Sequence, residues 1–448
     1  MQQNLTQGSI WGNIRKFSLP YLLSYFMQAL YGLADMFIIG MFNGADVITA
    51  VSAGSQVMHM IITMTVGFAL ASTVLISRAV GANDQKRISE IIGNSISLFF
   101  GISLVLTVLL LILTNPIVRL FQTPAEAVTQ TAIYLRICFI GIPFIVAYNV
   151  IAAFFRGLGD SKSPMYFIAI ACAANIGLDF LFVGPLGLKA AGAALGTILA
   201  QALSVIISII VMFRRKRGIK LSVSDFKLKR RIINLLIKIG LPTSVQEGCI
   251  QVSFIVITII ANTRGVEIAA AVGIVEKIIT FLFLVPSTMM STTSALAAQN
   301  FGAGQPKRSS HTMFACMSIG AGAGLLAFAL CNIVPGTIVG LFTSDPHVIE
   351  LGIQYLRPYS LDCFIAAVHF CFSGYFIASG KSYLSFIHNI ISIIVMRIPG
   401  AWIASVRWPQ TLFPMGCAAP LGSFISVVIC AVFYLALRRK LEKVYTKD

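Results

Sequence analysis

The chain has 448 residues, of which 57% are hydrophobic and 11% are charged, and its mean hydropathy is +0.88. Soluble domains are about half apolar and about a quarter charged, so this composition excludes a soluble globular protein and predicts a polytopic helical membrane protein. The net charge of +17 fits this class without nucleic acid as a partner, because the cytoplasmic loops of membrane proteins collect Lys and Arg.

Twelve apolar segments follow one another along the chain, and each reaches the length of about 20 residues that a helix needs to cross a bilayer core. The predicted fold class is therefore all-α integral membrane, with twelve transmembrane helices. The N-terminal residues MQQNLTQGS lack the pattern of a cleaved signal peptide, so we expect the first helix to stay in the mature protein. The approximate limits of the segments are 15–40, 50–77, 91–114, 130–154, 164–184, 190–213, 232–262, 268–298, 312–334, 352–378, 384–405 and 413–437.

Basic residues concentrate in alternate loops between these segments. The loop RRKRGIKLSVSDFKLKRR, residues 214–231, carries one acid among many bases, whereas the opposite loops carry single bases such as Arg119 and Lys189. Because positive charge favours the cytoplasmic side, we expect a multi-pass protein of the inner (plasma) membrane with both termini in the cytoplasm. The 214–231 loop then needs no role beyond topology and contact with lipid headgroups.

The sequence repeats itself at an offset of 221 residues. VGANDQKR at 80–87 returns as FGAGQPKR at 301–308, and IYLR at 133–136 returns as QYLR at 354–357. The GAND and GAGQ stretches have the composition of tight turns. Matches in the same order at one offset indicate an internal duplication.

The duplication divides the chain into an N-terminal six-helix bundle (1–213), a basic cytoplasmic linker (214–231) and a C-terminal six-helix bundle (232–448). Because six is even, the two halves have the same orientation and are parallel repeats. Transporters built in this way place a central cavity between the halves and rock them alternately. All nine cysteines lie in or next to apolar segments without a CxxC pair, which indicates buried small side chains rather than disulfides or a metal site.

Acidic residues inside the predicted spans are the main functional signal. A charge at the bilayer centre costs about 2.5–3.5 kcal/mol on insertion scales, so such residues usually face a watery cavity or a partner. The five that we find are Asp35, Asp179, Glu247, Glu276 and Asp362.

Four polar residues of the first half should meet at one depth. Asn175 and Asp179 are four apart and share a helical face, while Asp35 and Thr197 lie at a similar depth in two other segments. Two carboxylates, an amide oxygen and a hydroxyl suit Na⁺, or a proton shared between close carboxyl groups. The alternative is that each acid is separately paired with water or a neighbouring donor.

The second half repeats the helices of the first half but does not have acidic residues at the positions equivalent to Asp35 and Asp179. Its candidates are Glu247, Asp362 and the cation Arg397, whose role is either a salt bridge to one of these acids or contact with substrate. Glu276 is adjacent to Lys277 and points away from it, so we assign it no role. The in-span histidines, His59 and His369, are interpreted as hydrogen-bonded packing residues rather than proton relays. Some of the 32 Phe and 15 Met residues should line the cavity, because such surfaces adapt to varied apolar cations.

The motifs resemble the multidrug and toxic compound extrusion (MATE) transporters over essentially the full length. The resemblance rests on LADMFIIG around Asp35, the VGAND turn, FRGLGDSKSPM at 155–165, NIGLDFLFVGPLGLKAAGAALGT at 175–197, GLP followed by Glu247, and SLD at 360–362. It implies a monomeric antiporter that exchanges Na⁺ or H⁺ for organic, often cationic, drugs. It also implies that the positions of Asp35, Asn175, Asp179 and Thr197 bind the coupling cation.

The resemblance leaves the coupling ion open. Some branches of the family also use second-half acids that match Glu247 and Asp362, and this sequence has both sets. The second copy of the RGLGD motif reads IASGK, which weakens a symmetric role for it. We expect no cofactor besides the coupling ion.

Two other functions are compatible with a polytopic membrane protein. A flippase for lipid-linked or amphipathic substrates would need a strongly cationic cavity, and here the in-span acids outnumber clear in-span cations. A membrane-embedded enzyme would need a catalytic constellation, and no HExxH, GxSxG or paired metal-ligand pattern is present. We therefore expect a transporter rather than an enzyme.

Overall fold

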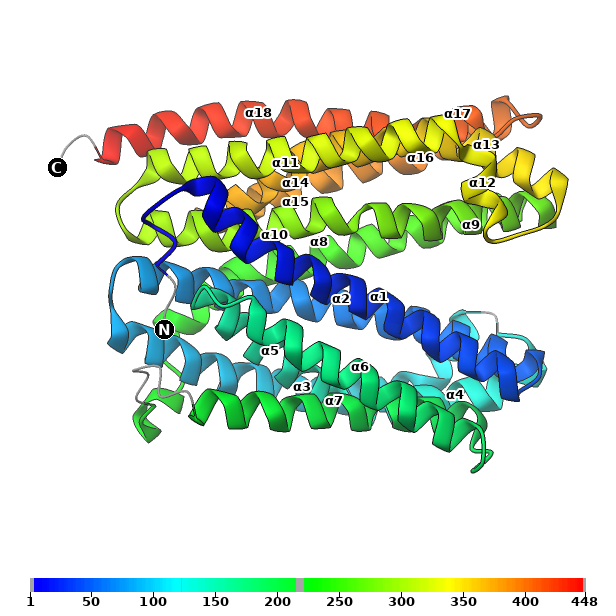
Figure 1. The fold of residues 1–448 in the computed structure, drawn as a ribbon, viewed down its shortest axis with the longest axis horizontal. Coiled ribbons are helices and arrows are strands. Elements are labelled where there is room, and N and C mark those ends of the chain that lie inside the picture. The colour runs from blue at the N-terminus through cyan, green and yellow to red at the C-terminus, as the bar shows by residue number, and fades with distance from the viewer. Residues whose placement is uncertain (1–3, 122, 215–220, 446–448) are drawn as a thin grey trace. The chain divides into compact units, whose positions relative to one another are not determined.

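The computed structural model describes residues 4–121, 123–214 and 221–445, and the described residues form helices joined by short turns, with no strand (Figure 1). The elements are α1 (Ile10–Phe42), α2 (Ala45–Gly81), α3 (Gln85–Leu120), α4 (Ala125–Ile140), α5 (Ile142–Gly157), α6 (Lys162–Val183), α7 (Lys189–Arg214), η1 (Val223–Phe226, a 3₁₀ turn), α8 (Arg230–Asn262), α9 (Val266–Leu282), α10 (Leu284–Gly302), α11 (Pro306–Ile333), α12 (Pro335–Gly340), α13 (Pro346–Ser360), α14 (Asp362–Ala378), α15 (Ser382–Ser392), η2 (Ile393–Arg397, a π-helical turn), α16 (Ile398–Arg407), α17 (Phe413–Gly416) and α18 (Ala418–Tyr445).

These helices supply the spans that the hydropathy pattern predicts. Among the described residues, eleven helical stretches are long and apolar enough to cross a membrane, and the number is twelve when α4 and α5, bent by 48° at Gly141, count as one span. The predicted all-α membrane fold is therefore confirmed. The breaks inside single predicted spans, such as the one at Leu361 between α13 and α14, were not predicted.

Backbone geometry confirms the duplication. Asn83 and Gly304 both adopt positive φ, at 54° and 71°, and their positions differ by 221 residues. Gly159 and Gly380 form a second such pair, at 85° and 75°. Positive φ is the left-handed region that Gly and Asn tolerate best, so the tight turns predicted at GAND and GAGQ are present in both halves.

Side-chain contacts repeat at the same offset. The Thr73 hydroxyl donates to the Ala153 carbonyl at 3.1 Å, and the Ser294 hydroxyl donates to the Gly374 carbonyl at 3.2 Å. Each bond ties two helices together where they pack closely, because a hydroxyl in a helix interior can reach a neighbouring carbonyl only at short range. The duplicated sequence therefore encodes duplicated helix pairs.

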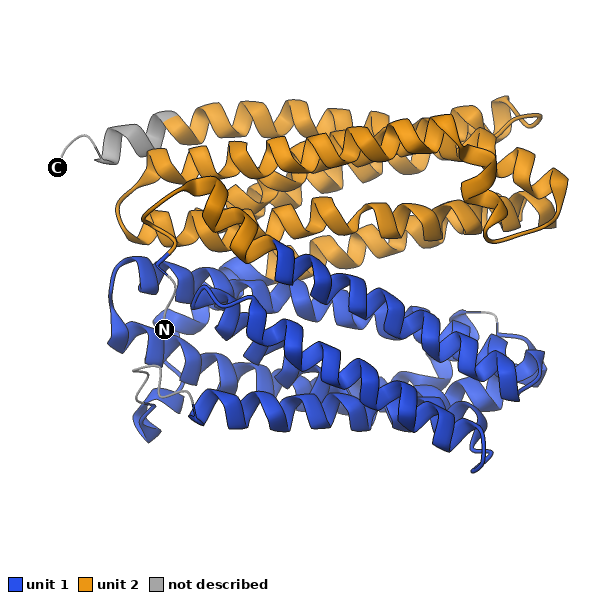
Figure 2. Cartoon of the chain, in the orientation of Figure 1, with its two compact units in different colours: residues 1–4, 19–240 blue, residues 5–18, 241–448 orange. Residues whose placement is uncertain are grey.

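The chain forms two compact units (Figure 2). The first consists mainly of Leu19–Gly240, and the second combines Leu5–Ser18 with the chain from Leu241 onward. The division falls inside α8, close to the linker that the sequence predicts as the boundary. The grouping of the N-terminal segment with the second unit was not predicted.

In the first unit, part of the predicted basic linker packs on α3. Asn94 donates to the Asp225 carbonyl at 3.0 Å and accepts from the Lys229 backbone N–H at 2.6 Å, while the Lys229 ammonium pairs with Glu90 at 2.8 Å. The linker residues after 220 therefore pack along α3. Residues 215–220 lie outside the described part of the chain.

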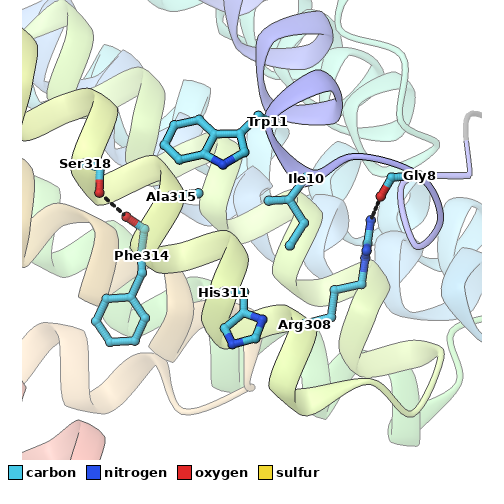
Figure 3. Close-up of a pocket in the computed structure, with 8 residues that line it drawn as sticks. All are labelled: Gly8, Ile10, Trp11, Arg308, His311, Phe314, Ala315 and Ser318. Carbon is cyan, nitrogen blue, oxygen red and sulfur yellow. Dashed lines mark hydrogen bonds between the residues drawn. The ribbon is translucent and has the colours of Figure 1, made fainter.

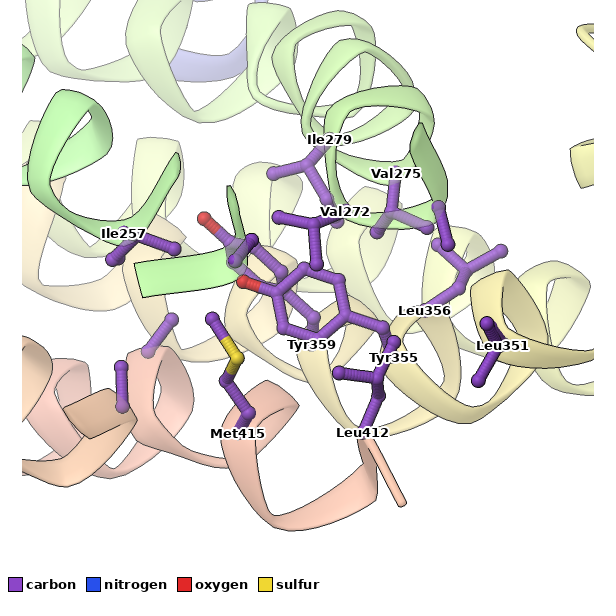
Figure 4. Close-up of a cluster of buried hydrophobic side chains, with 14 of the residues drawn as sticks. Ile257, Val272, Val275, Ile279, Leu351, Tyr355, Leu356, Tyr359, Leu412 and Met415 are labelled. Atoms are coloured by element: carbon purple, nitrogen blue, oxygen red, sulfur yellow. The ribbon is translucent and has the colours of Figure 1, made fainter. Parts of the chain in front are cut away.

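In the second unit, an apolar core joins α8, α9, α13 and α17 (Figure 4). Tyr355 and Tyr359, on successive turns of α13, are almost fully buried and contact each other edge to face, with ring centroids 5.4 Å apart. Because lipid tails are as apolar as these side chains, such a core is stabilised by van der Waals packing between the helices. The same core orients the Tyr359 hydroxyl toward the polar residues described below.

Candidate functional site

Three helices of the first unit, α1, α6 and α7, supply the polar residues of the candidate site. Asp35 is only 7% exposed, although its neighbours Leu33 and Phe37 on α1 are 47% and 68% exposed. Asn175 and Asp179 on α6 are fully buried. Each acid therefore faces the interior of the unit rather than the lipid.

The four residues predicted to meet do lie together. The Asp35 carboxyl approaches the side chains of Asp179, Asn175 and Thr197. Tyr31, one helical turn before Asp35, lies beside Thr197 and both carboxyl groups. Tyr31 was missed in the sequence, although its i−4 spacing from Asp35 places it on the same face of α1.

A glycine makes room for this cluster. Gly196 precedes Thr197 on α7, and a Cβ atom at this position would overlap the Asp179 carboxyl oxygen Oδ1. The backbone of α7 therefore approaches the carboxyl more closely than any other residue type would allow. Small residues at helix contacts are typical of membrane proteins for this reason.

The polar atoms of the cluster are near one another but are not hydrogen-bonded in good geometry. Buried polar atoms are normally paired, so a group of unpaired polar atoms at one point needs a partner that these side chains do not supply, such as water or an ion. Within the described residues, the buried atoms without a hydrogen-bond partner include Tyr31 OH, Asp35 Oδ1, Asn175 Oδ1 and Nδ2, Asp179 Oδ1 and Oδ2, and Thr197 Oγ1.

The chemistry of this donor set is that of a hard cation. Carboxylate, amide and hydroxyl oxygens are ligands for ions such as Na⁺ or Ca²⁺, whereas soft or transition metals prefer sulfur and imidazole. The described chain contains no cluster of three or more His, Cys, Asp or Glu side chains that could hold a metal. Two adjacent carboxyl groups also repel each other unless a cation or a proton lies between them.

A second polar cluster lies in the second unit around Arg397. Its guanidinium donates to the Tyr359 hydroxyl at 3.0 Å and stacks over the Phe254 ring at 4.5 Å from the centroid. Asp362, which is 1% exposed, and Glu276 both interact electrostatically with it. The Arg397 guanidinium therefore contacts the face of the Phe254 ring and the Tyr359 hydroxyl, and two acids lie near it.

The acids around Arg397 differ in part from those that the sequence suggested. Among the described residues, Arg397 makes no direct ion pair with Glu247 or Asp362, so the salt bridge considered as its structural role is not formed. Glu276, to which we assigned no role, accepts a hydrogen bond from Thr258 at 3.3 Å and is one of the two acids near the guanidinium. The π-helical turn that ends at Arg397 changes the helical phase, which a regular periodicity cannot anticipate.

The in-span histidines behave differently from one another. His59 is exposed on α2. His369 is 4% exposed and packs edge to face against His388, with ring centroids 5.6 Å apart. His388 is hydrogen-bonded to the Ser373 and Ser426 hydroxyls at 2.8 and 3.2 Å.

The MatE family model matches the chain twice, at residues 20–181 and 242–403, once in each half of the duplication. The chain belongs to the MatE family. Members of this MATE family are multi-pass multidrug efflux transporters that bind drugs and other small organic substrates, and they are not enzymes.

Relatives of known name agree with this membership. The chain is 28% identical to probable multidrug resistance protein YpnP of Bacillus subtilis (strain 168) over 446 residues, covering 99% of both chains. It is 24% identical to probable multidrug resistance protein YoeA of the same organism, covering 98% of this chain and 96% of the relative. The fold matches an outward-facing multidrug resistance MATE family transporter of the MOP superfamily with a TM-score of 0.91, at 22% identity and 98% coverage of both chains.

Proposed function

We propose that this MATE-family chain is a cation-coupled antiporter that exports organic, often cationic, compounds by alternating access. The coupling cation, Na⁺ or H⁺, binds at Asp35, Asn175, Asp179 and Thr197, with Tyr31 as a further ligand. The observation that supports this proposal is the group of buried, unpaired oxygen atoms that α1, α6 and α7 place at one point.

Coupling requires that cation and drug favour different conformations of the protein. Empty and ionised, the two carboxyl groups repel each other and attract a cation from the outer side. A bound cation removes that repulsion and allows α1, α6 and α7 to pack more tightly. A drug that prefers the other conformation is then released outward, because a ligand shifts an equilibrium only by its differential affinity for the two states.

The basic loops suggest the orientation of the transporter in the membrane. We propose that both termini and the linker of residues 214–231 are cytoplasmic, because the linker and the C-terminal tail hold the densest Lys and Arg clusters and six spans, an even number, separate the N-terminus from the linker. Export then runs from the side that contains the linker, and transport needs no cofactor besides the coupling ion.

The flippase alternative finds less support in the second unit. An anionic lipid carrier would need a cation whose charge is not already balanced. Arg397 instead lies near Asp362 and Glu276, and its donors are partly used by Tyr359. A cationic or neutral drug is therefore the better match to the charges of this unit.

The test measures ethidium efflux from a host that lacks its own drug pumps, with and without this chain. Efflux is recorded at fixed pH with NaCl or with choline chloride, and again after the proton gradient is collapsed at constant Na⁺. Loss of efflux on removal of Na⁺ identifies Na⁺ as the coupling ion, and loss with the proton gradient identifies H⁺. Efflux that survives both treatments contradicts cation coupling.

A further inference from the structure

A groove of about 570 Å³ opens at one end of the second unit, between the start of α1 and the first three turns of α11 (Figure 3). Both walls belong to this unit, because Leu5–Ser18 groups with it. Gly8 and Trp11 form one wall, and Arg308, His311, Phe314 and Ala315 form the other. Neither the cation site nor the Arg397 cluster shares a residue with this groove.

The groove has a polar end and an apolar end. Arg308 lies in the first turn of α11 and reaches the Gly8 carbonyl, His311 lies on the next turn, and Trp11 lies near Ala315 (Figure 3). Trp11 and Phe314 are 56% and 43% exposed. A charged end followed by exposed aromatic side chains is the arrangement that occurs at the level of lipid headgroups.

Arg308 is held in place but retains donors for a ligand. One terminal nitrogen of its guanidinium donates to the Gly8 carbonyl at 2.7 Å, which fixes the side chain across the groove. Its Nε atom is buried, so the donors that can reach a ligand in the groove are those of the terminal nitrogens. A guanidinium carries five N–H donors in a planar fork, so the remaining donors are oriented for a tetrahedral oxyanion.

The surrounding charges select an anion. The segments that form the groove, residues 5–18 and 284–318, contain no Asp or Glu, whereas they contain Arg15, Lys16, Lys307 and Arg308. The ammonium of a zwitterionic headgroup would therefore find no acidic partner in either segment. A phosphate whose headgroup is otherwise neutral meets the Arg308 guanidinium and no acidic side chain of either segment.

We propose that this groove binds an anionic phospholipid, with the phosphate at Arg308 and His311 and the upper part of an acyl chain along Trp11 and Phe314. A lipid held there bridges the start of α1 to α11 in addition to the existing hydrogen bond between Arg308 and Gly8. The bound lipid thereby anchors the N-terminal segment to the second unit. This role is independent of the coupling ion and of the exported drug.

The test uses quenching of Trp11 fluorescence by brominated lipid. The chain has three tryptophans, so Trp402→Phe and Trp408→Phe leave Trp11 as the single emitter. The purified full-length protein in detergent micelles is titrated with brominated phosphatidylglycerol, with brominated phosphatidylcholine, and with brominated phosphatidylglycerol plus inorganic phosphate. Arg308→Gln and His311→Gln are compared with Lys307→Gln, which removes the same charge from an exposed neighbour that does not line the groove.

We expect saturable quenching by phosphatidylglycerol, with affinity lowered about tenfold or more by Arg308→Gln, because a hydrogen bond to a charged group is lost. His311→Gln should weaken binding to a smaller degree, and Lys307→Gln should not change it. His311 is exposed, so its variant keeps the test valid if Arg308→Gln fails to fold. Equal quenching by both lipids, equal weakening by Lys307→Gln and Arg308→Gln, or full competition by inorganic phosphate would each overturn the proposal.

Discussion

The close approach of α7 to Asp179 allows a test of the cation site without removal of any ligand. In Gly196→Ala, the new methyl group would overlap the Asp179 carboxyl oxygen, so the carboxyl must move by about 1 Å to restore normal contact. A misplacement of about 1 Å in a preorganised site can reduce its activity about 100-fold, which corresponds to about 2.7 kcal/mol. We therefore expect the rate of ethidium efflux to fall by about 10- to 100-fold. The smaller loss applies if α6 relaxes in part around the new methyl group.

The effect of Gly196→Ala on folding should be smaller than its effect on transport. Overpacking costs about 1–3 kcal/mol, and replacement of a helical glycine by alanine returns about 0.5–1 kcal/mol. Gly177→Ala is the matched control, because it lies on α6 between Asn175 and Asp179 and a Cβ there meets nothing within 4 Å. Efflux by Gly196→Ala equal to that of Gly177→Ala, at equal expression, would refute the assignment of this cluster as the coupling site.

Three further changes test other parts of the structure. Asp35→Asn should abolish ethidium efflux. Asp46→Asn, which changes an exposed acid at the start of α2, should retain it. Normal efflux by cells that carry Asp35→Asn would show that this carboxyl group takes no part in the mechanism. Gly324→Ala would drive a methyl group into the α14 backbone, which should reduce the free energy of unfolding by about 1–3 kcal/mol and lower the melting temperature. Gly322→Ala is the control, because a Cβ atom there faces open space. Equal melting temperatures of the two variants would contradict the close packing of α11 on α14. His388→Ala removes the imidazole from the buried Ser373 and Ser426 hydroxyls, although Ser426 keeps its bond to the carbonyl of residue 388. It should destabilise the protein by about 1–3 kcal/mol in thermal unfolding, and an unchanged transition would show that the two imidazole bonds contribute nothing.

The spans and the duplication were predictable because each depends on many residues. Twenty consecutive apolar side chains leave no alternative to a membrane helix, and the GAND and GAGQ turns mark the same left-handed backbone in both halves. The helix breaks at Gly141 and Leu361 were missed although Pro143 and Pro358 lie close to them, because proline alone does not decide a break: α3 continues through Pro116. Such breaks arise from tertiary packing: at Gly141, for example, a Cβ atom would collide with the side chain of Ile198 on α7.

The first-unit cluster was predictable because its acids stand out against an apolar background and regular helices carry them. Depth along α1, α6 and α7 follows from residue count alone, and the i, i+4 spacing fixes the face. The partners of Arg397 were not predictable in the same way. The π-helical turn adds one residue to a helical turn and so changes the direction in which the Arg397 side chain points. Whether Glu247 or Glu276 lies near its guanidinium depends on how each helix is rotated in the folded unit.

The offset of 221 residues places Gly141 of the first half opposite Asp362 of the second. A freshly duplicated gene encodes interchangeable copies, and differences such as this one, glycine against aspartate at equivalent positions, end that equivalence. A chain built from two first halves would lack both Arg397 and Asp362, because the equivalent positions are Ile176 and Gly141, and one built from two second halves would lack Asp35. The two halves share one origin, but their charged residues lie at different positions, so neither half can substitute for the other.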